Sequence, residues 1–236
     1  MAAGPATDFY VATLHRLKEA GIPFLVGGAY ALGAYADIYR ETKDFDIFCR
    51  AADYPAILGV LSEAGWRIEV TDANWLAKAF YDGYYVDLIF NSHNGLCPVD
   101  DSWFEHAPAS EVLGVKVRLV PPEEVIWTKV YVQDRHRFDG ADVYHIIRKI
   151  GAQLDWERLL QRFAVHWQLL LGQLLTYRFV YPSDAHQVPA QVMQTLLERE
   201  REQESLPTSQ DRICRGQMLS TTQYEIDIKD WGYAPR

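Results

Sequence analysis

The strongest constraint on the fold comes from a glycine pair, Gly27-Gly28, and from two aspartates that follow it about one helix later, Asp44 and Asp46. Aspartate is depleted in β-strands, yet these two alternate with apolar residues in a short run over residues 44–49. Because side chains alternate across a strand with a period of two, both carboxylates are expected on the same side. Two adjacent negative charges require a cation. The spacing therefore predicts a strand that presents ligands for a divalent metal ion.

The residues around the glycine pair predict an anion site. Residues 22–27 end in an apolar run typical of a buried strand, and residues 29–39 are predicted to form a helix. Gly27-Gly28 then forms the turn between them, where the backbone comes close to another group. The first N–H groups of a helix bind anions, so this turn is suited to phosphates. N–H groups for phosphates beside carboxylates for Mg²⁺ are what a nucleoside triphosphate with its metal ions requires.

Asp87 is the third candidate ligand. It is a lone acid at the centre of a strongly apolar and aromatic run that predicts a strand over residues 84–90. If this strand lies beside the one that carries Asp44 and Asp46, three carboxylates can hold two metal ions about 3.5–4 Å apart, the spacing used for in-line phosphoryl transfer. The sequence does not establish that the two strands are neighbours.

The order of these features resembles the DNA polymerase beta-like nucleotidyltransferase superfamily. A segment of the form Arg-x-Thr-x-Asp-x-Asp is similar to a bacterial branch that includes abortive-infection and toxin–antitoxin nucleotidyltransferases and some aminoglycoside adenylyltransferases. Its residues here are Arg40, Thr42, Asp44 and Asp46. The resemblance covers about residues 20–150. The chain departs from the family pattern in two ways: no serine stands in the glycine turn, where Ala29 follows, and fifteen residues separate Gly28 from Asp44.

The resemblance implies a polymerase beta-like α/β (α+β) fold, with a mixed sheet flanked by helices and a helical C-terminal region. It implies transfer of a nucleoside monophosphate from an NTP to a hydroxyl acceptor, with release of pyrophosphate. The cofactor would be two Mg²⁺ ions, with Mn²⁺ as the substitute. The implied catalytic and metal-binding residues are Asp44, Asp46 and Asp87. The implied nucleotide-binding residues are Gly27, Gly28, Arg40, Thr42 and Lys129.

Lys129 belongs to a second charged stretch, which is similar to a Lys…Arg…Asp-x-x-Asp element of the same branch. It is expected on a helix, from which its ammonium group could reach a triphosphate as a mobile charge. Asp139 and Asp142 follow at the start of the next helix, where Asp139 is a potential N-cap and either acid can orient Lys129. The alternative is a solvated helix face on which these charges pair only with one another.

The pattern along the chain divides it into an α/β half and a helical half at Pro121-Pro122. Predicted strands lie at 22–27, 44–49, 66–71, 84–90 and in a hairpin at 110–120, with helices at 6–20, 29–39 and 53–64. After residue 121, helices are predicted at 122–134, 139–150, 155–178, 189–204 and 220–230. We therefore expect a nucleotidyltransferase domain at 1–121, a helical domain at 122–205 and a tail with a short helix at 206–236.

The composition of the chain indicates which kinds of binding partner and environment are expected. The net charge of −9 disfavours a large nucleic-acid footprint, because binding a polyanion depends on Lys and Arg. Three widely spaced cysteines, Cys49, Cys97 and Cys214, favour reduced, buried thiols over disulfides or a zinc site. The absence of a charged leader and of a long apolar run predicts a cytoplasmic protein without a membrane span.

Several alternatives remain open at the level of sequence. Asp44 and Asp46 could be exposed acids on an edge strand, with Lys43 as an edge charge, and Asp87 could be a solitary strand acid. The acceptor could be a polycation resembling an aminoglycoside, a tRNA end or a protein hydroxyl. The alternative function is a catalytically degenerate nucleotide-binding or interaction module with the same fold.

Overall fold

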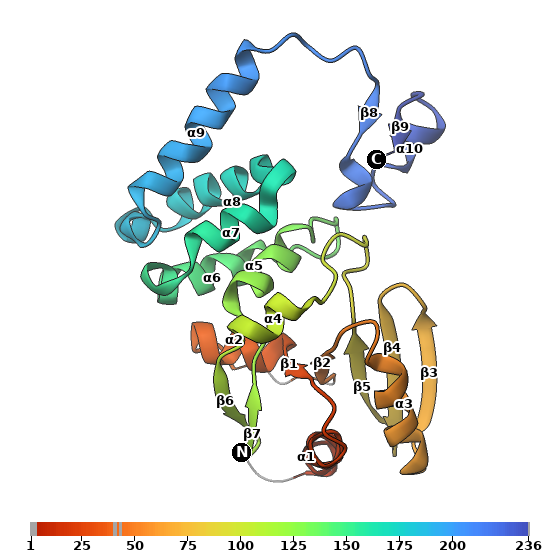
Figure 1. Ribbon diagram of the computed structural model, residues 1–236. Helices are drawn as coiled ribbons and strands as arrows, with labels where there is room; N and C mark the ends of the chain where they lie inside the picture. The colour runs from red at the N-terminus through yellow and green to blue at the C-terminus, as the bar shows by residue number, and fades with distance from the viewer. Residues whose placement is uncertain (1–3, 40–41, 43, 236) are drawn as a thin grey trace. The chain divides into compact units, whose positions relative to one another are not determined.

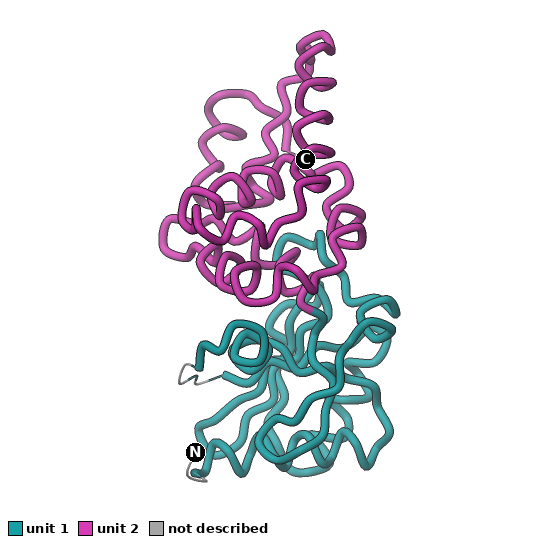
Figure 2. The backbone as a smooth tube through the Cα atoms, turned by 90° about the vertical axis from the view of Figure 1, so that its left-hand side faces the viewer, with its two compact units in different colours: residues 1–121 teal, residues 122–236 magenta. Residues whose placement is uncertain are grey.

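The computed structural model describes residues 4–39, 42 and 44–235. The chain divides into two compact units, unit 1 (Met1–Pro121) and unit 2 (Pro122–Arg236), which are coloured separately in Figure 2. The expectation that residues 1–121, 122–205 and 206–236 are separate domains stays a prediction.

A five-stranded mixed sheet forms the centre of unit 1 (Figure 1). The strand order is β1-β2-β5-β4-β3. β2 and β5 are parallel, whereas the other neighbouring strands are antiparallel. The bounds are β1 (Leu25–Val26), β2 (Asp46–Phe48), β3 (Arg67–Asp72), β4 (Leu76–Tyr81) and β5 (Tyr84–Ile89). The predicted α/β class with a mixed sheet is confirmed.

Strand β4 is absent from the sequence prediction, which placed no strand between residues 71 and 84. It forms a hairpin with β5 through Asp82-Gly83, whose φ angles are +48° and +82°. Two-residue hairpin turns with positive φ at both positions favour Asp-Gly, because their twist matches that of the flanking strands. The Asp-Gly pair was therefore an available sequence signal for this strand.

The two faces of the sheet differ in character. Alternate residues such as Ile47, Ala79 and Val86 are fully buried. Helices α1 (Pro5–Glu19) and α3 (Tyr54–Glu63) contact each other and strands β3 to β5. The side chains in between project from the opposite face, since successive residues of a strand alternate. Four charged residues on that face are register partners in one row across the sheet: Asp46, Asp87, Lys78 and Glu69.

The other elements of unit 1 extend from this sheet. Helix α2 (Gly28–Ala36) follows β1, and α4 (Asp101–His106) precedes a hairpin of β6 (Ala109–Val112) and β7 (Val115–Arg118), which confirms the hairpin predicted at 110–120. A parallel bridge between Val26 and Leu119 connects the end of this hairpin to β1.

Unit 2 is mainly helical, as predicted. Its helices are α5 (Pro122–Val130), α6 (Gly140–Ile150), α7 (Trp156–Phe163), α8 (Trp167–Val180), α9 (Ala190–Ser205) and α10 (Glu225–Lys229). Short 3₁₀ turns lie at η1 (Gly151–Gln153), η2 (Ala164–His166), η3 (Pro182–Gln187) and η4 (Gly216–Met218), and β8 (Ile213–Cys214) pairs with β9 (Ala234–Pro235). The single helix predicted at 155–178 is wrong: α7 ends at Phe163, because the next residue, Ala164, has a φ of +36°, which is incompatible with a continuous right-handed helix. The helix predicted at 122–134 ends at Val130.

The two acids in the first turn of α5, Glu123 and Glu124, contact another helix. Acids at this position are favoured by the helix dipole. In the structure both are buried, and Glu124 forms ion pairs with Arg158 and Arg162 of α7. Glu123 accepts a hydrogen bond of 2.8 Å from the backbone N–H of Asp155. These acids therefore join α5 to α7.

The cysteines of the chain form no disulfide in the described residues. Cys49 and Cys97 are free and buried, as predicted, whereas Cys214 is only half-buried. Throughout the described part of the chain, no helix has both the length and the apolar character needed to cross a membrane.

Candidate active site

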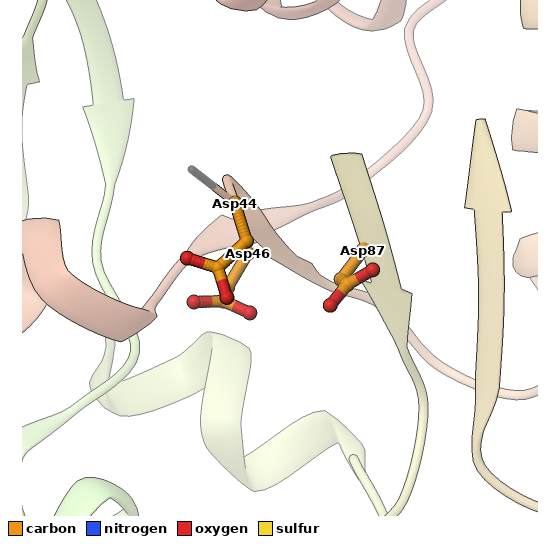
Figure 3. A group of neighbouring side chains, drawn as sticks. All are labelled: Asp44, Asp46 and Asp87. Carbon is orange, nitrogen blue, oxygen red and sulfur yellow. The ribbon is translucent and has the colours of Figure 1, made fainter. Parts of the chain in front are cut away.

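Three aspartates meet on the charged face of the sheet (Figure 3). Asp46 of β2 and Asp87 of β5 are direct register partners in the parallel strand pair. Asp44 lies two residues before Asp46 on the same side. One carboxylate oxygen from each of the three lies within 4.8 Å of the others. The adjacency that the sequence left open is thus present in the structure.

The backbone around β2 explains why these side chains converge. The regular strand is shorter than predicted, because it begins at Asp46 and not at residue 44. Pairing with β5 nevertheless continues on both sides: the N–H of Asp87 donates to the carbonyl of Phe45, and the N–H of Cys49 donates to the carbonyl of Ile89. Phe45, Ile47 and Cys49 are fully buried. Their burial fixes the register and directs the intervening aspartates to the opposite face.

Thr42 restrains Asp44 directly. Its hydroxyl group donates to the carboxylate of Asp44, and the backbone N–H of Asp44 donates to the threonine oxygen over 3.3 Å. These contacts orient the carboxylate of Asp44, whereas the nucleotide-binding role implied for Thr42 stays a prediction. Arg40, which the sequence analysis assigned to the nucleotide site, lies outside the described residues.

The glycine pair touches the aspartates. The N–H of Gly27 donates to the carbonyl of Asp46 over 3.0 Å, and α2 begins at Gly28. Gly28 has a φ of +54°, and a Cβ atom placed there would lie 1.7 Å from Asp46 Oδ2. Only glycine fits this position without displacing the carboxylate. The close backbone approach predicted for this turn is therefore made to Asp46.

Lys78 is part of the site and was missed by the sequence analysis. It lies opposite Asp87 in the β4–β5 register, and its Nζ is 2.5 Å from Asp87 Oδ1. The side chain of Lys78 is 20% exposed and that of Asp87 is 14% exposed. A lysine at the centre of an alternating apolar run was the available signal, but it required β4 to be recognised first.

Burial and charge oppose each other at Asp87. Burial raises the pKa of the Asp87 carboxyl, and the neighbouring Asp44 carboxylate raises it further, whereas the hydrogen bond and charge of Lys78 lower it. Tyr10, whose ring stacks on Phe45 at 4.8 Å between centroids, interacts electrostatically with Asp44. Burial, followed by nearby groups that include Tyr30 and Asp44, raises the pKa of Tyr10 to about 12.

Lys129 lies in unit 2 and is held by two carboxylates there. Its Nζ is 2.8 Å from Asp139 Oδ2 and 2.9 Å from Asp142 Oδ2. Asp139 does occupy the N-cap position of α6, but its side chain accepts no capping hydrogen bond from the helix. The predicted cap is thus correct in position and wrong in contact, because the carboxylate pairs with Lys129. The role of Lys129 as a phosphate ligand stays a prediction.

The donor set of the three aspartates fits magnesium. All the donors are carboxylate oxygens, which suit hard cations such as Mg²⁺ and Mn²⁺ better than softer metals that prefer thiolate or imidazole. Among the described residues, this is the one group of three or more potential metal ligands that lie so close together.

A comparison with known families gives the class of protein that carries this mixed sheet and aspartate cluster. A family profile described as "Uncharacterised nucleotidyltransferase" matches residues 10–180, well over half of the chain. The chain belongs to this family, and it is an enzyme of the nucleotidyltransferase type. The membership that the sequence motifs suggested is thereby confirmed. No protein with curated annotation matches the sequence.

Solved structures with a similar fold include several nucleotidyltransferases. Lincomycin-bound LnuA, a lincosamide antibiotic adenylyltransferase, is 16% identical, with a TM-score of 0.43, over 62% of this chain and 98% of its own. ANT(2")-Ia in complex with adenylyl-2"-tobramycin is 16% identical, with a TM-score of 0.46, over 67% and 95% of the two chains. An antigenic nucleotidyltransferase-like protein from Paracoccidioides brasiliensis is 15% identical, with a TM-score of 0.47, over 78% and 93%.

Proposed function

We propose that this protein is a metal-dependent nucleotidyltransferase that moves a nucleoside monophosphate from an NTP to a hydroxyl group of an acceptor and releases pyrophosphate. The observation that supports this most directly is the convergence of three carboxylates from two adjacent parallel strands beside the glycine-initiated helix α2. Repulsion among the three clustered carboxylates is unfavourable, and a bound divalent ion would offset it.

The roles of the residues follow from their charge and position. Asp44 and Asp46 would hold two Mg²⁺ ions, for which Mn²⁺ can substitute, and Asp87 would share one of them. Such ions, when bound, neutralise phosphate charge and lower the pKa of the acceptor hydroxyl group. Asp87 would accept the proton of that hydroxyl group as the new phosphoester bond forms. Gly27 and Gly28 would leave room for phosphate oxygens at the first N–H groups of α2.

The remaining assigned residues act on the nucleotide in this proposal. Thr42 keeps Asp44 in the orientation needed for metal binding. Arg40 and Lys129 would neutralise phosphate charge, and Asp139 and Asp142 would keep the ammonium group of Lys129 oriented. The charge that Arg40 and Lys129 would neutralise is the negative charge that develops on the pyrophosphate as it leaves.

For the acceptor we propose a small hydroxyl compound that carries positive charge. The net charge of −9 favours attraction of a cationic molecule and opposes extended contact with a polyanion such as tRNA. A protein hydroxyl or a tRNA end would remain chemically compatible with the same aspartates, so the experiment includes them as competing acceptors.

The test is incubation with each NTP, labelled on the α-phosphate, in the presence of Mg²⁺. Aminoglycosides, tRNA and cell lysate are supplied as separate sources of acceptor. We expect label in a small cationic product together with stoichiometric pyrophosphate. Binding of NTP and Mg²⁺ without label transfer to any acceptor would instead support the degenerate binding module.

Substitution of the aspartates tests the assignment of the site. Asp44→Ala or Asp46→Ala is expected to lower transfer by at least about 1,000-fold, because each would remove a ligand of the reacting metal ions. The melting temperature measured without metal should not fall, since each change removes one of three clustered like charges. Full transfer activity in the double variant with metal present would contradict the proposal.

A further inference from the structure

Lys78 brings a fixed positive charge into the row of acids on the sheet. Its ammonium group forms an ion pair with Asp87 Oδ1 and lies 4.4 Å from the centroid of the Tyr85 ring. The register also places Glu69 opposite Lys78, on the other side of β4. Glu69 instead contacts Arg67 at 3.1 Å and Thr71 at 3.3 Å. Among these described contacts, the charge of Lys78 is thus directed toward Asp87.

This ion pair involves only one of the two oxygens of Asp87. Oδ1 is bound by Lys78. Figure 3 shows one carboxylate oxygen of Asp87 turned toward Asp46 and the other turned away from it. The contact with Lys78 therefore engages one of the two Asp87 oxygens and restrains the rotation of the carboxylate group.

The same contact has an electrostatic consequence for metal binding. Only the carboxylate group of Asp87 would separate a metal ion bound to Asp87 from the ammonium group of Lys78. Both partners are mostly withdrawn from water, so their charges are screened less than at the surface. A divalent ion entering the triad alone is consequently repelled by Lys78. An ion that arrives with the phosphates of a nucleotide brings negative charge that offsets this repulsion.

We propose that Lys78 is a positioning residue that lowers the affinity of the aspartate triad for free divalent metal and so couples metal binding to nucleotide binding. This inference rests on the proposed function, because it assumes that Asp44, Asp46 and Asp87 are the metal ligands. The inference also sets the order of binding. In the free enzyme Lys78 balances the charge of Asp87, and the metal ions bind strongly only when the triphosphate is present.

The test compares Lys78→Met, which removes the charge, with Lys78→Arg, which retains it. The Kd of Mn²⁺ is measured from the electron paramagnetic resonance signal of the free ion, first without nucleotide and then with a non-hydrolysable NTP analogue. Without nucleotide, Lys78→Met is expected to bind Mn²⁺ at least about tenfold more tightly than the wild type. Lys78→Arg should stay within about threefold of the wild type. The analogue should tighten Mn²⁺ binding more in the wild type than in Lys78→Met.

An unchanged or weakened Mn²⁺ affinity in Lys78→Met would overturn the inference. Lys78→Gln removes the same charge with a polar side chain and replaces Lys78→Met if that variant does not fold. Asp46→Asn separates this inference from the proposed function. If wild type and Asp46→Asn bind Mn²⁺ equally in the presence of the analogue, or if wild type binds none there, the proposed metal site itself is wrong. If Asp46→Asn loses binding while Lys78→Met gains none, only the role of Lys78 is wrong.

Discussion

At the scale of single residues, Asp46 and Gly28 depend on each other. Asp46 provides a carboxylate to the triad, and its oxygen occupies the space that a side chain at position 28 would need. The glycine also has a φ of +54°, in the region that L-residues rarely adopt. The conformation of one residue therefore sets the position of a proposed metal ligand.

Gly28→Ala tests this dependence. The new methyl group would displace the carboxylate of Asp46, so transfer activity is expected to fall about 100-fold, as for other small misplacements of reacting groups. Backbone strain should lower the free energy of unfolding by about 1–3 kcal/mol. Steady-state kinetics and urea unfolding measure the two effects. Gly59→Ala in α3 is the matched control, because a Cβ atom there meets nothing within 4 Å, and full activity in Gly28→Ala would exclude the dependence.

Asp139 allows a prediction about pH. Burial opposes its ionisation, but the charges and hydrogen bonds of Lys129 and Arg137 outweigh burial and lower its pKa from the ordinary value of 3.8. A carboxylate with a lowered pKa stabilises the folded state above its unfolded pKa, and this contribution is lost as the pH falls through the folded pKa.

The variant Asp139→Asn lacks this contribution. Urea unfolding should show a difference in stability between wild type and variant that is constant from pH 7 to about pH 5 and shrinks as the pH falls below 3.8. A difference that grows with acidification would show that the sign of the pKa shift is wrong.

At the scale of elements, the contact between α5 and α7 depends on buried charge. Glu124 is fully buried and pairs with Arg158 and Arg162. Burial raises the pKa of Glu124, while the two guanidinium groups lower it, with burial the larger effect. The two ion pairs of Glu124 therefore contribute little net stability. Removal of one partner is nevertheless costly, because it leaves a buried charge without an opposite charge beside it.

Glu124→Ala is expected to lower the free energy of unfolding by about 3–5 kcal/mol, because it leaves the buried guanidinium of Arg158 without its carboxylate. Chemical denaturation measures this loss. Glu157→Ala, an exposed acid in the first turn of α7, serves as the control and should change stability by less than about 0.5 kcal/mol. Equal effects of the two substitutions would mean that the buried ion pairs do not join the helices.

At the scale of the whole molecule, charge bears on the choice of acceptor. The chain has a net charge of −9, which raises the local concentration of cations at low salt. For a cationic acceptor, KM should rise severalfold between about 50 and 300 mM salt, because the screening length shortens well below 10 Å. A neutral hydroxyl acceptor provides the comparison. A salt-independent KM for the cationic acceptor would show that net charge does not contribute to its recognition.

The sequence alone predicted the class of the fold and the aspartates of the candidate site. Two carboxylates at a spacing of two must share one side of a strand, and Gly-Gly before a helix permits a close backbone approach; both are properties of the local chain. These local rules were sufficient to select Asp44, Asp46 and the glycine turn. They also predicted the mixed α/β sheet and the helical second half, although they failed at β4 and at the break before α8.

The tertiary structure decided which distant residues meet. Asp87 joins Asp46 because β2 and β5 pair in parallel in one particular register. Lys78 joins Asp87 because β4 is the other neighbour of β5. Glu124 pairs with α7 because that helix packs on α5. Strand order and register depend on burying the apolar side chains of all the strands together, and no local spacing specifies them. The aspartates could therefore be predicted from the sequence, whereas only the order of the strands placed the positive charge of Lys78 beside Asp87.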